Sequence, residues 1–416
     1  MINVNSNANL PSVAKKQRVK KPSLVREGGT ACRDGRVVSA ISSRLHNLLF
    51  LKIFERGVGK TFAKVFPTNI PMYNFEKTIE QWRVEQHVAG IAVAITDRDR
   101  IIWARGFGVE NTDRPNVPVS EKSMHRAASI TKIFSGITML KLVEEGLLDL
   151  DAPVKTYVPW LTLKDEDAAE KMTLRHLLSH TSGLPKEYTP EGARDEAALG
   201  PTLRVELPEA ELVSKPGEGK YLYSNLGIRL ASLCAERVTG KRFTELVQDT
   251  VLTPLGMEET TFDLRVAATY PISVPHEKDE NGNPVPYRRI KENAARMAAG
   301  GLYSTAEDLC KMARCLLRGC KTEDGTPILR EETFTEMCRV HADADEKYSY
   351  GLTMRLQHFG DRDLKGHHGY APPYSSSLFV DPISGFGVAT MINTECDGLR
   401  ERIPELVFAE LIGGQK

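Results

Sequence analysis

The order of hydrophobic and polar residues between positions 73 and 104 predicts a helix followed by a β-hairpin. Residues 73–88 place apolar side chains at near-helical spacing among charged ones, which is typical of an amphipathic helix. Two short apolar runs follow at 91–95 and 101–104, joined by the polar segment 96–100. Runs of this length with a polar connection predict two paired strands.

A second strand-rich region lies near the other end of the chain. Apolar runs at 352–356, 377–380 and 387–392 predict strands, and residues 381–385 between the last two have the composition of a hairpin turn. Residues 400–411 predict a closing helix. A long region without comparable strand signals separates the two ends, so we expect both ends to share one sheet and the middle to form a mainly helical lobe.

The middle of the chain carries the helical patterns. Residues 129–148 are apolar on nearly every side, which predicts a buried helix. Ser304 and Glu307 have the spacing of a capping box for a helix that ends near Leu317. The segment 200–219, rich in Gly and Pro, predicts a loop that forms one wall of a pocket. Shorter helices are expected at 173–178, 225–238 and 243–252.

Composition bounds the class of protein. The chain has 416 residues, 41% of them hydrophobic, which is enough for a large two-lobed unit. Lys and Arg outnumber Asp and Glu by 13 to 3 in residues 1–70, whereas Asp and Glu outnumber them by 52 to 42 in residues 71–416. The body is therefore mildly acidic, which argues against a nucleic-acid partner.

Cysteine usage and hydropathy bear on location. The seven cysteines have no C-x-x-C spacing and are odd in number, so a disulfide framework is not indicated and a reducing compartment is expected. No apolar run approaches the ~20 residues that would span a bilayer, and no standard signal peptide is evident. We expect a cytoplasmic or an organellar, mitochondrial location and no clear secretion signal.

Residues 1–70 form a basic, acid-poor extension that allows three interpretations. It is a poorly ordered tail, a targeting presequence, or, least favoured, a tail for anionic membranes or nucleic acid. The first strongly patterned helix follows Met72, so an alternative start there is a hypothesis. The folded domain is expected to occupy residues 71–416.

Ser129 and Lys132 are the first candidates for chemistry. Side chains three apart on a helix are neighbours, so the lysine could take the proton from a serine that is otherwise a poor nucleophile. Burial of the helix would lower the pKa of the amine and make it a usable base. The alternative is an ordinary helix start with a snorkelling lysine, and Ser12 and Lys15 show that the spacing also arises by chance.

A metal site is not indicated. His176 and His180 lie four apart and could share a metal on one helical face, but no Glu lies between them and no third ligand is near. A hydrogen-bonded turn that ends at Gly183 is favoured instead. We therefore expect neither a metal nor another cofactor.

Three motifs in order resemble one family. They are Ser129-x-x-Lys132, Tyr223-x-Asn225 and Gly366-His367-His368-Gly369. Their order and spacing are similar to the serine β-lactamase and penicillin-binding-protein superfamily, in particular its class C-like branch with family VIII esterases and peptidases. The resemblance covers roughly residues 72–412 and includes the segments 180–185, 254–257 and 300–305.

The resemblance implies an α+β fold of the β-lactamase/transpeptidase type. An antiparallel sheet flanked by the N- and C-terminal helices would form one lobe, from about 71–125 and 300–416, and residues 126–299 would form the mainly helical lobe. The active site would lie in the cleft between them.

The resemblance also assigns roles to the motif residues. Ser129 would be the acyl-accepting nucleophile, with Lys132 and Tyr223 as the proton-handling pair and Lys132 favouring the phenolate of Tyr223. Asn225 would orient Lys132 and the substrate. The backbone N–H groups of Ser129 and of Tyr370, on an edge strand after Gly369, would hold the oxyanion.

His367 marks a departure from β-lactamases. A lysine commonly opens the corresponding motif there and meets the carboxylate of the drug, whereas His367 would be only partly charged at pH 7. His358-Phe359-Gly360 has the same spacing, but His358 is expected at the end of a strand. The difference favours ester or amide substrates over β-lactams.

The expected activity is hydrolysis of a small carboxylic ester through an acyl-enzyme on Ser129. One alternative is an acyltransferase, a D-amino-acid-type peptidase or a β-lactamase on the same site. The other is a family member that binds or assembles without catalysis. No G-x-S-x-G elbow of an α/β-hydrolase is present, and the sequence leaves the oligomeric state open.

Overall fold

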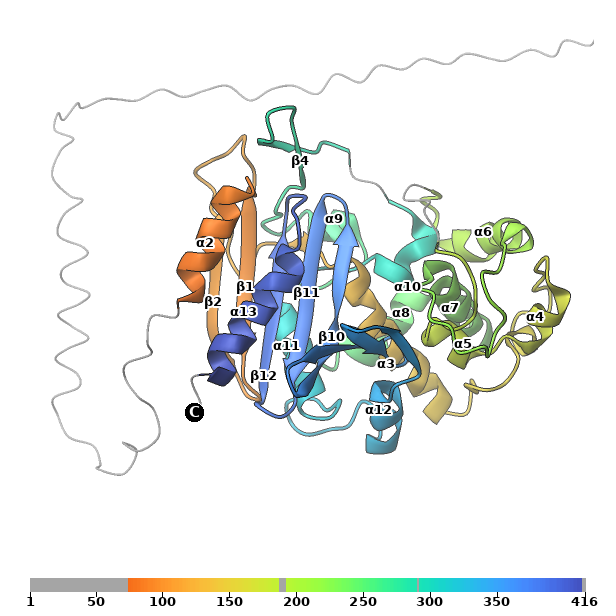
Figure 1. Ribbon diagram of the computed structural model, residues 1–416. Coiled ribbons are helices and arrows are strands. Elements are labelled where there is room, and N and C mark those ends of the chain that lie inside the picture. Colours follow the sequence, from red (N-terminus) through yellow and green to blue (C-terminus); the bar gives the residue numbers. More distant parts are fainter. Residues whose placement is uncertain (1–73, 187–191, 290–291, 414–416) are drawn as a thin grey trace, which may run out of the picture. The chain divides into compact units, whose positions relative to one another are not determined.

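The computed structural model describes residues 74–186, 192–289 and 292–413. The 1–70 extension lies outside the described residues, so its three interpretations stay as predictions. Within the unit 71–416 the main feature is one eight-stranded antiparallel sheet, in the order β2-β1-β12-β11-β10-β9-β8-β7 (Figure 1). Its strands are β1 (Gly90–Thr96), β2 (Ile101–Gly108), β7 (Ala342–Asp345), β8 (Tyr348–Tyr350), β9 (Arg355–Phe359), β10 (Arg362–Ala371), β11 (Tyr374–Asp381) and β12 (Phe386–Ile392).

The sheet joins the two ends of the described chain. β1 pairs with β12 in the register Ile91 to Ile392, which places the first predicted hairpin directly beside the last predicted strand. The expectation that both ends share one sheet is confirmed. Two small two-stranded sheets lie outside it, one of β3 (His125–Arg126) and β6 (Tyr303–Ser304) and one of β4 (His276–Lys278) and β5 (Pro284–Pro286).

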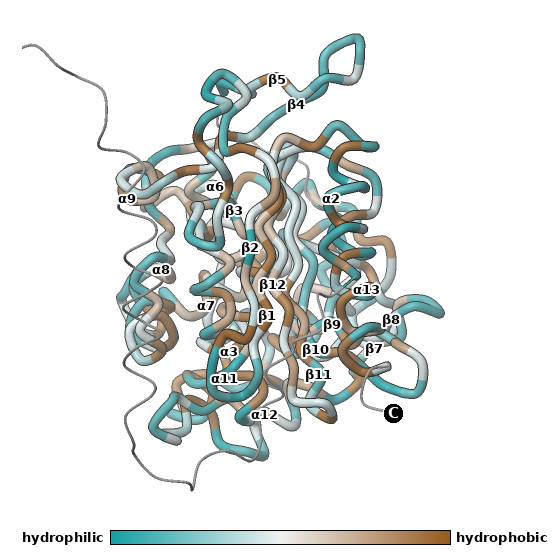
Figure 2. The backbone as a smooth tube through the Cα atoms, turned by 90° about the vertical axis from the view of Figure 1, so that its left-hand side faces the viewer, coloured by the Kyte–Doolittle hydropathy of each residue, from teal (hydrophilic) through white to brown (hydrophobic). Residues whose placement is uncertain are grey.

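Helices cover both faces of the sheet, which explains why β1 reads as a continuous apolar run. Successive residues of a strand point to opposite faces. Ile91, Val93 and Ile95 pack with the cluster that includes α2 (Phe75–Glu85) and α13 (Leu399–Gly413), and Ala92 and Ala94 face the larger core that contains α11 (Ala306–Leu317). Figure 2 shows α2 and α13 on one side of the sheet and α11 on the other. The predicted flanking of the sheet by the first and last helices is confirmed.

The helical region lies beside β10 and β9, at the far side of the sheet from β2 (Figure 1). Its centre is α3, in which nearly every residue from Thr131 to Leu142 is buried, as the apolar pattern predicted. The helices of the middle region are α3 (Thr131–Glu144), α4 (Glu166–Lys171), α5 (Leu174–Leu178), α6 (Leu199–Glu206), α7 (Asn225–Thr239), α8 (Phe243–Val247), α9 (Leu264–Ala267) and α10 (Met297–Gly300), and α12 (Glu331–Cys338) follows α11.

Several local predictions differ from the structure. The cap of α11 is Thr305, which accepts the N–H of Asp308 at 3.0 Å, because Ser304 is held in β6. The strand predicted at 352–356 begins at Arg355 instead. Strand β10 had no apolar signal of its own. It carries His367 and His368 in a polar run, and its pairing with β9 and β11 makes it a strand.

Candidate active site

Ser129 lies in a tight turn directly before α3. The turn, η1 (Ala128–Ile130), is a 3₁₀ turn, and Ala128 adopts a left-handed φ of 50° that disfavours a non-glycine residue. Two hydroxyl groups fix this conformation. Thr131 Oγ1 donates to the carbonyl of Ala128 at 2.6 Å, and Ser376 Oγ on β11 donates to the carbonyl of Ala127 at 2.8 Å. The strained turn is thus locked by its surroundings, as at many functional sites.

Lys132 is fully buried on the first turn of α3 and touches three oxygen atoms. Its Nζ lies 3.1 Å from Ser129 Oγ, 2.8 Å from Asn225 Oδ1 and 2.6 Å from the carbonyl oxygen of Ala299. Asn225 Oδ1 and the Ala299 carbonyl can only accept, so they take two N–H bonds. The remaining tetrahedral position of the Lys132 amine faces Ser129 Oγ. In the neutral amine this position holds the lone pair. No pattern in the sequence predicts the contribution of the Ala299 carbonyl.

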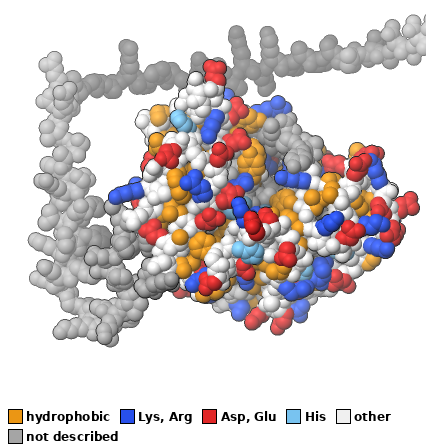
Figure 3. Space-filling model, viewed as in Figure 1, with side chains coloured by type: hydrophobic (Ala, Val, Ile, Leu, Met, Phe, Trp, Pro, Cys, Tyr) orange, Lys and Arg blue, Asp and Glu red, His pale blue; other side chains and the backbone are white. Residues whose placement is uncertain are grey.

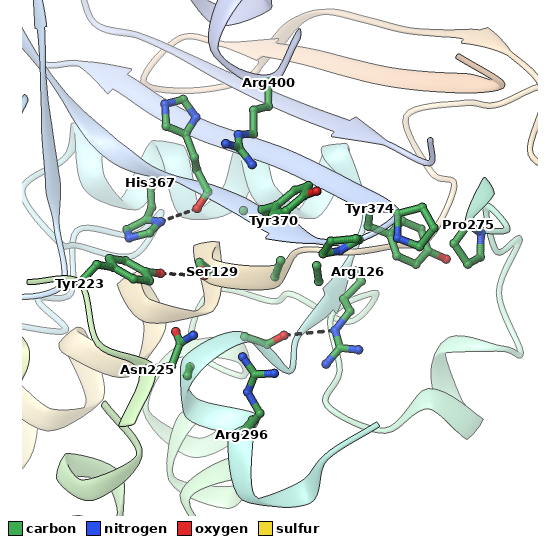
Figure 4. Close-up of a pocket in the computed structure, with 18 of the residues that line it drawn as sticks. Arg126, Ser129, Tyr223, Asn225, Pro275, Arg296, His367, Tyr370, Tyr374 and Arg400 are labelled. Atoms are coloured by element: carbon green, nitrogen blue, oxygen red, sulfur yellow. Dashed lines mark hydrogen bonds between the residues drawn. The ribbon is translucent and has the colours of Figure 1, made fainter. Parts of the chain in front are cut away.

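Tyr223 completes the contact with the serine. Its phenol donates to Ser129 Oγ at 2.8 Å (Figure 4). The centroid of its ring lies 4.8 Å from Lys132 Nζ. Burial raises the pKa of this phenol, while the hydrogen bond with Ser129 and the charges of Arg296 and Arg355 act in the opposite direction. The phenol is therefore neutral near pH 7, which differs from the expected phenolate.

His180 holds the Tyr223 segment in place, a role that its metal-like spacing in the sequence did not suggest. Its carbonyl accepts the N–H of Leu222 at 2.7 Å, and its Nδ1 accepts the N–H of Ser224 at 3.2 Å, so one residue contacts the backbone on both sides of Tyr223. Its ring centroid lies 4.5 Å from that of Tyr223. Burial keeps the pKa of His180 well below its usual value, so the ring is neutral.

Ser224 and Asn225 form the start of α7. Ser224 Oγ accepts the N–H of Gly227 at 3.0 Å and is the cap of this helix. Asn225 is the first helical residue, and its amide is thereby free to face Lys132. His176, the other histidine of the pair, accepts the N–H of Thr173 at 3.2 Å and belongs to a capping box. Among the described residues no group of three His, Cys, Asp or Glu side chains could hold a metal ion.

His367 lies on β10 and lines the same cavity as Ser129 and Tyr223. His358 lies on β9 and does not line this cavity, and its Nδ1 lies 2.7 Å from Asp363 Oδ1. The Nε2 of His367 contacts the hydroxyl of Tyr350 at 2.9 Å. Burial lowers the pKa of His367 to about 3. The expectation that it is partly charged at pH 7 is wrong, because the imidazole lies almost out of contact with water.

Gly369 allows β10 to approach the serine turn. A Cβ at this position would lie 2.1 Å from Ser376 Oγ and 2.3 Å from the carbonyl oxygen of Ala127, too close for any side chain. Tyr370 follows it. β10 pairs with β9 only over Arg362 to Gly366, so β10 is an interior strand whose second half has an open edge beside the serine turn.

These residues surround one cavity of about 620 Å³. Ser129, Tyr223, Asn225, His367, Gly369 and Tyr370 all line it. The predicted wall from residues 200–219 is wrong, since none of them lines this cavity and part of the segment forms α6. Lys132 lies beneath the serine, out of contact with the cavity. Among the described helices none is long and apolar enough to cross a membrane.

Comparisons with known proteins give this arrangement its context. The sequence profile of the beta-lactamase family matches residues 75–409. Protein flp of Staphylococcus aureus strain MW2 is 26% identical over 343 residues, which cover 82% of this chain and 66% of that protein. The chain thus spans just under two thirds of the length of this relative.

Two solved structures share the fold. The octameric penicillin-binding protein homologue from Pyrococcus abyssi is 26% identical with a TM-score of 0.72, and the match covers 82% of this chain and 77% of that chain. The D-amino acid amidase from Ochrobactrum anthropi is 21% identical with a TM-score of 0.69, and covers 82% of this chain and 100% of that chain. The β-lactamase/transpeptidase-like fold, with its large antiparallel sheet, is confirmed.

Proposed function

This chain belongs to the beta-lactamase family of serine hydrolases, and on that premise we propose that it cleaves carboxylic esters through a covalent acyl-enzyme on Ser129. One observation carries the proposal. Ser129 lines a cavity of about 620 Å³, and its Oγ lies 3.1 Å from Lys132 Nζ and 2.8 Å from the Tyr223 hydroxyl. A serine between a buried amine and a phenol is the arrangement that an activated nucleophile requires.

The proposed first step is acylation. Ser129 Oγ attacks the ester carbonyl and transfers its proton to the lone pair of Lys132, while Asn225 and Ala299 hold the amine in line. The negative charge on the former carbonyl oxygen is stabilised by the backbone N–H groups of Ser129 and Tyr370, two residues that line the cavity. When the tetrahedral intermediate collapses, the alcohol leaves with a proton that the neutral Tyr223 phenol supplies, and Lys132 returns its proton to Tyr223.

Deacylation reverses the proton path. A water molecule takes the place of the alcohol, gives its proton to the same pair, and attacks the acyl carbon. The bond to Ser129 Oγ then breaks, the acid leaves, and the serine regains a proton. No step in this sequence needs a cofactor.

The alternative activities at this site are cleavage of amides and transfer of the acyl group to an acceptor other than water. The fold neighbour from Ochrobactrum anthropi is an amidase by name, and an amide would use the same steps with a poorer leaving group. Esters are favoured because neutral His367 stands where β-lactamases commonly carry a charged lysine. A binding or assembly role without catalysis is the remaining alternative.

The test uses purified protein, a fluorophosphonate probe and p-nitrophenyl esters of graded chain length, with Ser129→Ala as the control. We expect labelling and ester hydrolysis that the substitution abolishes. Absence of labelling at Ser129 would refute the hydrolase and favour the binding role. Faster turnover of nitrocefin or of a D-amino acid amide than of every ester would refute the choice of substrate.

A further inference from the structure

The carbonyl of Ala299, which accepts a hydrogen bond from Lys132, belongs to a helix of a single turn, α10. The last four carbonyl groups of a helix have no N–H partner within it, so in a helix this short nearly every carbonyl depends on donors from elsewhere. Gly301 donates its N–H to the carbonyl of Met297 at 2.9 Å. The carbonyl groups of Ala298 and Ala299 are bonded by side chains of α3 instead.

Ser135 is the donor for Ala298. Its Oγ lies 2.7 Å from that carbonyl oxygen and is buried, with 1% of the residue exposed. Ser135 follows Lys132 by three positions on α3, so the two side chains are neighbours on one face of that helix. They bond two successive carbonyl groups of α10, and Ser135 thus fixes the peptide unit next to the one that Lys132 needs.

Arg229 holds the chain just before α10. Charged side chains of both signs are interspersed on the face of the protein in Figure 3, whereas Arg229 is fully buried on α7. Its Nε donates to the carbonyl of Ala295 at 2.7 Å, and its Nη1 pairs with Glu206 at 2.5 Å. A buried guanidinium is costly without such partners. Because Asn225 begins the same helix, α7 contacts Lys132 directly through Asn225 and supports it indirectly through Ala295.

The position of the Ala299 carbonyl bears on how Lys132 meets the serine. Its oxygen lies 2.6 Å from Nζ, closer than Asn225 Oδ1 at 2.8 Å. Two acceptors at fixed positions set the rotation of the amine, so that its remaining position faces Ser129 Oγ. A carbonyl acceptor also stabilises the ammonium form more than the neutral amine, so it contributes to the basicity of Lys132.

We propose that Ser135 and Arg229 are positioning residues for the reaction at Ser129. They hold α10 in place, so that the Ala299 carbonyl keeps the Lys132 amine aligned. The inference rests on the proposed function, because it names residues that serve the same site. Neither side chain lines the cavity. Their effect therefore falls on the chemical steps rather than on substrate binding.

Other groups around the lysine keep their charge state when Ser135 is replaced. The titratable and charged groups around Lys132 and Tyr223 are Tyr223 itself, His180, His367, Arg296 and Arg355. Burial keeps the phenol and both imidazoles neutral near pH 7, and the arginines stay charged. A change in the titration of Lys132 in such a variant therefore reports on its acceptor oxygens.

The experiment compares Ser135→Ala with the matched control Ser232→Ala. Both serines are buried on helices, and each donates to a carbonyl of its own helix, Ser135 to Thr131 at 3.2 Å and Ser232 to Arg229 at 2.8 Å. Of the two, Ser135 also donates to Ala298 on α10. The variants thus lose the same buried hydroxyl group and differ in the bond to α10.

Two quantities are measured for each protein. Steady-state kinetics with a p-nitrophenyl ester gives kcat and KM. NMR of protein labelled with ¹³C at the Cε of lysine gives the pKa of Lys132, with Lys132→Arg to assign the signal. The NMR titration needs no turnover.

We expect Ser135→Ala to lower kcat about tenfold or more and to change KM less than about twofold, because a misplaced base costs rate rather than binding. The pKa of Lys132 should fall by about half a unit or more, because the ammonium loses a fixed acceptor. Arg229→Lys keeps a positive charge beside Glu206 but not the planar fork, and it should lower kcat as well. Ser232→Ala should leave kcat and the pKa unchanged.

The inference requires both changes in Ser135→Ala. A kcat equal to that of Ser232→Ala would overturn it. A loss of kcat with an unchanged pKa of Lys132 would show a general structural defect and would overturn it too. If Arg229→Lys does not fold, Ser135→Ala still decides.

The two proposals fail separately. If the unmodified protein never reacts at Ser129, the proposed hydrolase is refuted, and the NMR titration alone decides whether Ser135 sets the state of Lys132. If the unmodified protein hydrolyses esters and Ser135→Ala behaves like Ser232→Ala in both measurements, only the positioning role is refuted.

Discussion

Replacing Tyr223 by Phe separates the chemical role of the phenol from the packing of its ring. The phenol makes one hydrogen bond in the described structure, to Ser129 Oγ at 2.8 Å, and the ring packs on His180 and near His367. Phe keeps the ring contacts. We therefore expect a stability loss of at most about 0.5–1.5 kcal/mol, the worth of one hydrogen bond.

The effect on catalysis should be much larger. A proton donor positioned on the reacting group contributes about 10²- to 10⁴-fold, or roughly 2.7–5.5 kcal/mol of barrier. Because the neutral phenol is proposed to protonate the leaving alcohol, the loss should depend on the leaving group. An ethyl ester, whose alkoxide is a poor leaving group, should lose more in kcat/KM than a p-nitrophenyl ester, whose phenolate leaves without a proton.

The assay compares both esters in the unmodified protein and in Tyr223→Phe, with stopped-flow measurement of the acylation phase and a thermal melt for stability. Tyr221→Phe is the control, since Tyr221 belongs to the same aromatic cluster but its hydroxyl faces Tyr348 at 3.5 Å. A loss below about tenfold for both esters, or an equal loss in Tyr221→Phe, would show that the phenol does not handle the proton.

Three further predictions concern the surroundings of the site. Gly369→Ala should lower both the activity and the melting temperature, because the new Cβ would lie 2.3 Å from the carbonyl oxygen of Ala127. Gly200→Ala in α6 is the control and should be neutral or slightly stabilising, because no atom lies closer than 3.7 Å to its Cβ. Equal melting temperatures of the two variants would contradict this prediction. His180→Phe should lower kcat about tenfold or more and His180→Asn should lower it less, because only Asn keeps an acceptor for Ser224, and the reverse order would count against the positioning role. Burial lowers the pKa of His125 to about 4, so below pH 6.5 the unfolded chain binds a proton that the folded protein does not. This histidine should therefore lower the free energy of unfolding by about 1.4 kcal/mol per pH unit between pH 6.5 and pH 4. Urea titrations at pH 7, 6 and 5 should show a weaker dependence of stability on pH in His125→Gln, and an identical dependence would exclude His125 as its source.

The sequence alone was sufficient for elements whose pattern is local. The run 91–95, the all-apolar helix after Ser129 and the turn at Asp381 each follow from side-chain periodicity or turn chemistry, and the structure has them within a few residues. The three motifs, read by resemblance, predicted the residues that meet at Ser129. The resemblance to the family carries this information, because periodicity alone does not bring residues so far apart in the chain together.

Only the tertiary structure determines the features that depend on contacts between residues far apart in the chain. Strand β10 exists because β9 and β11 pair with it, although its own residues are polar. The neutral state of His367 follows from burial that no local pattern reveals. The contact of Lys132 with the Ala299 carbonyl, and the position of Arg355 beside the cavity, arise only when remote segments come together. Sequence periodicity specifies which face of an element is buried, whereas protonation and charge depend on what the completed fold places around each group.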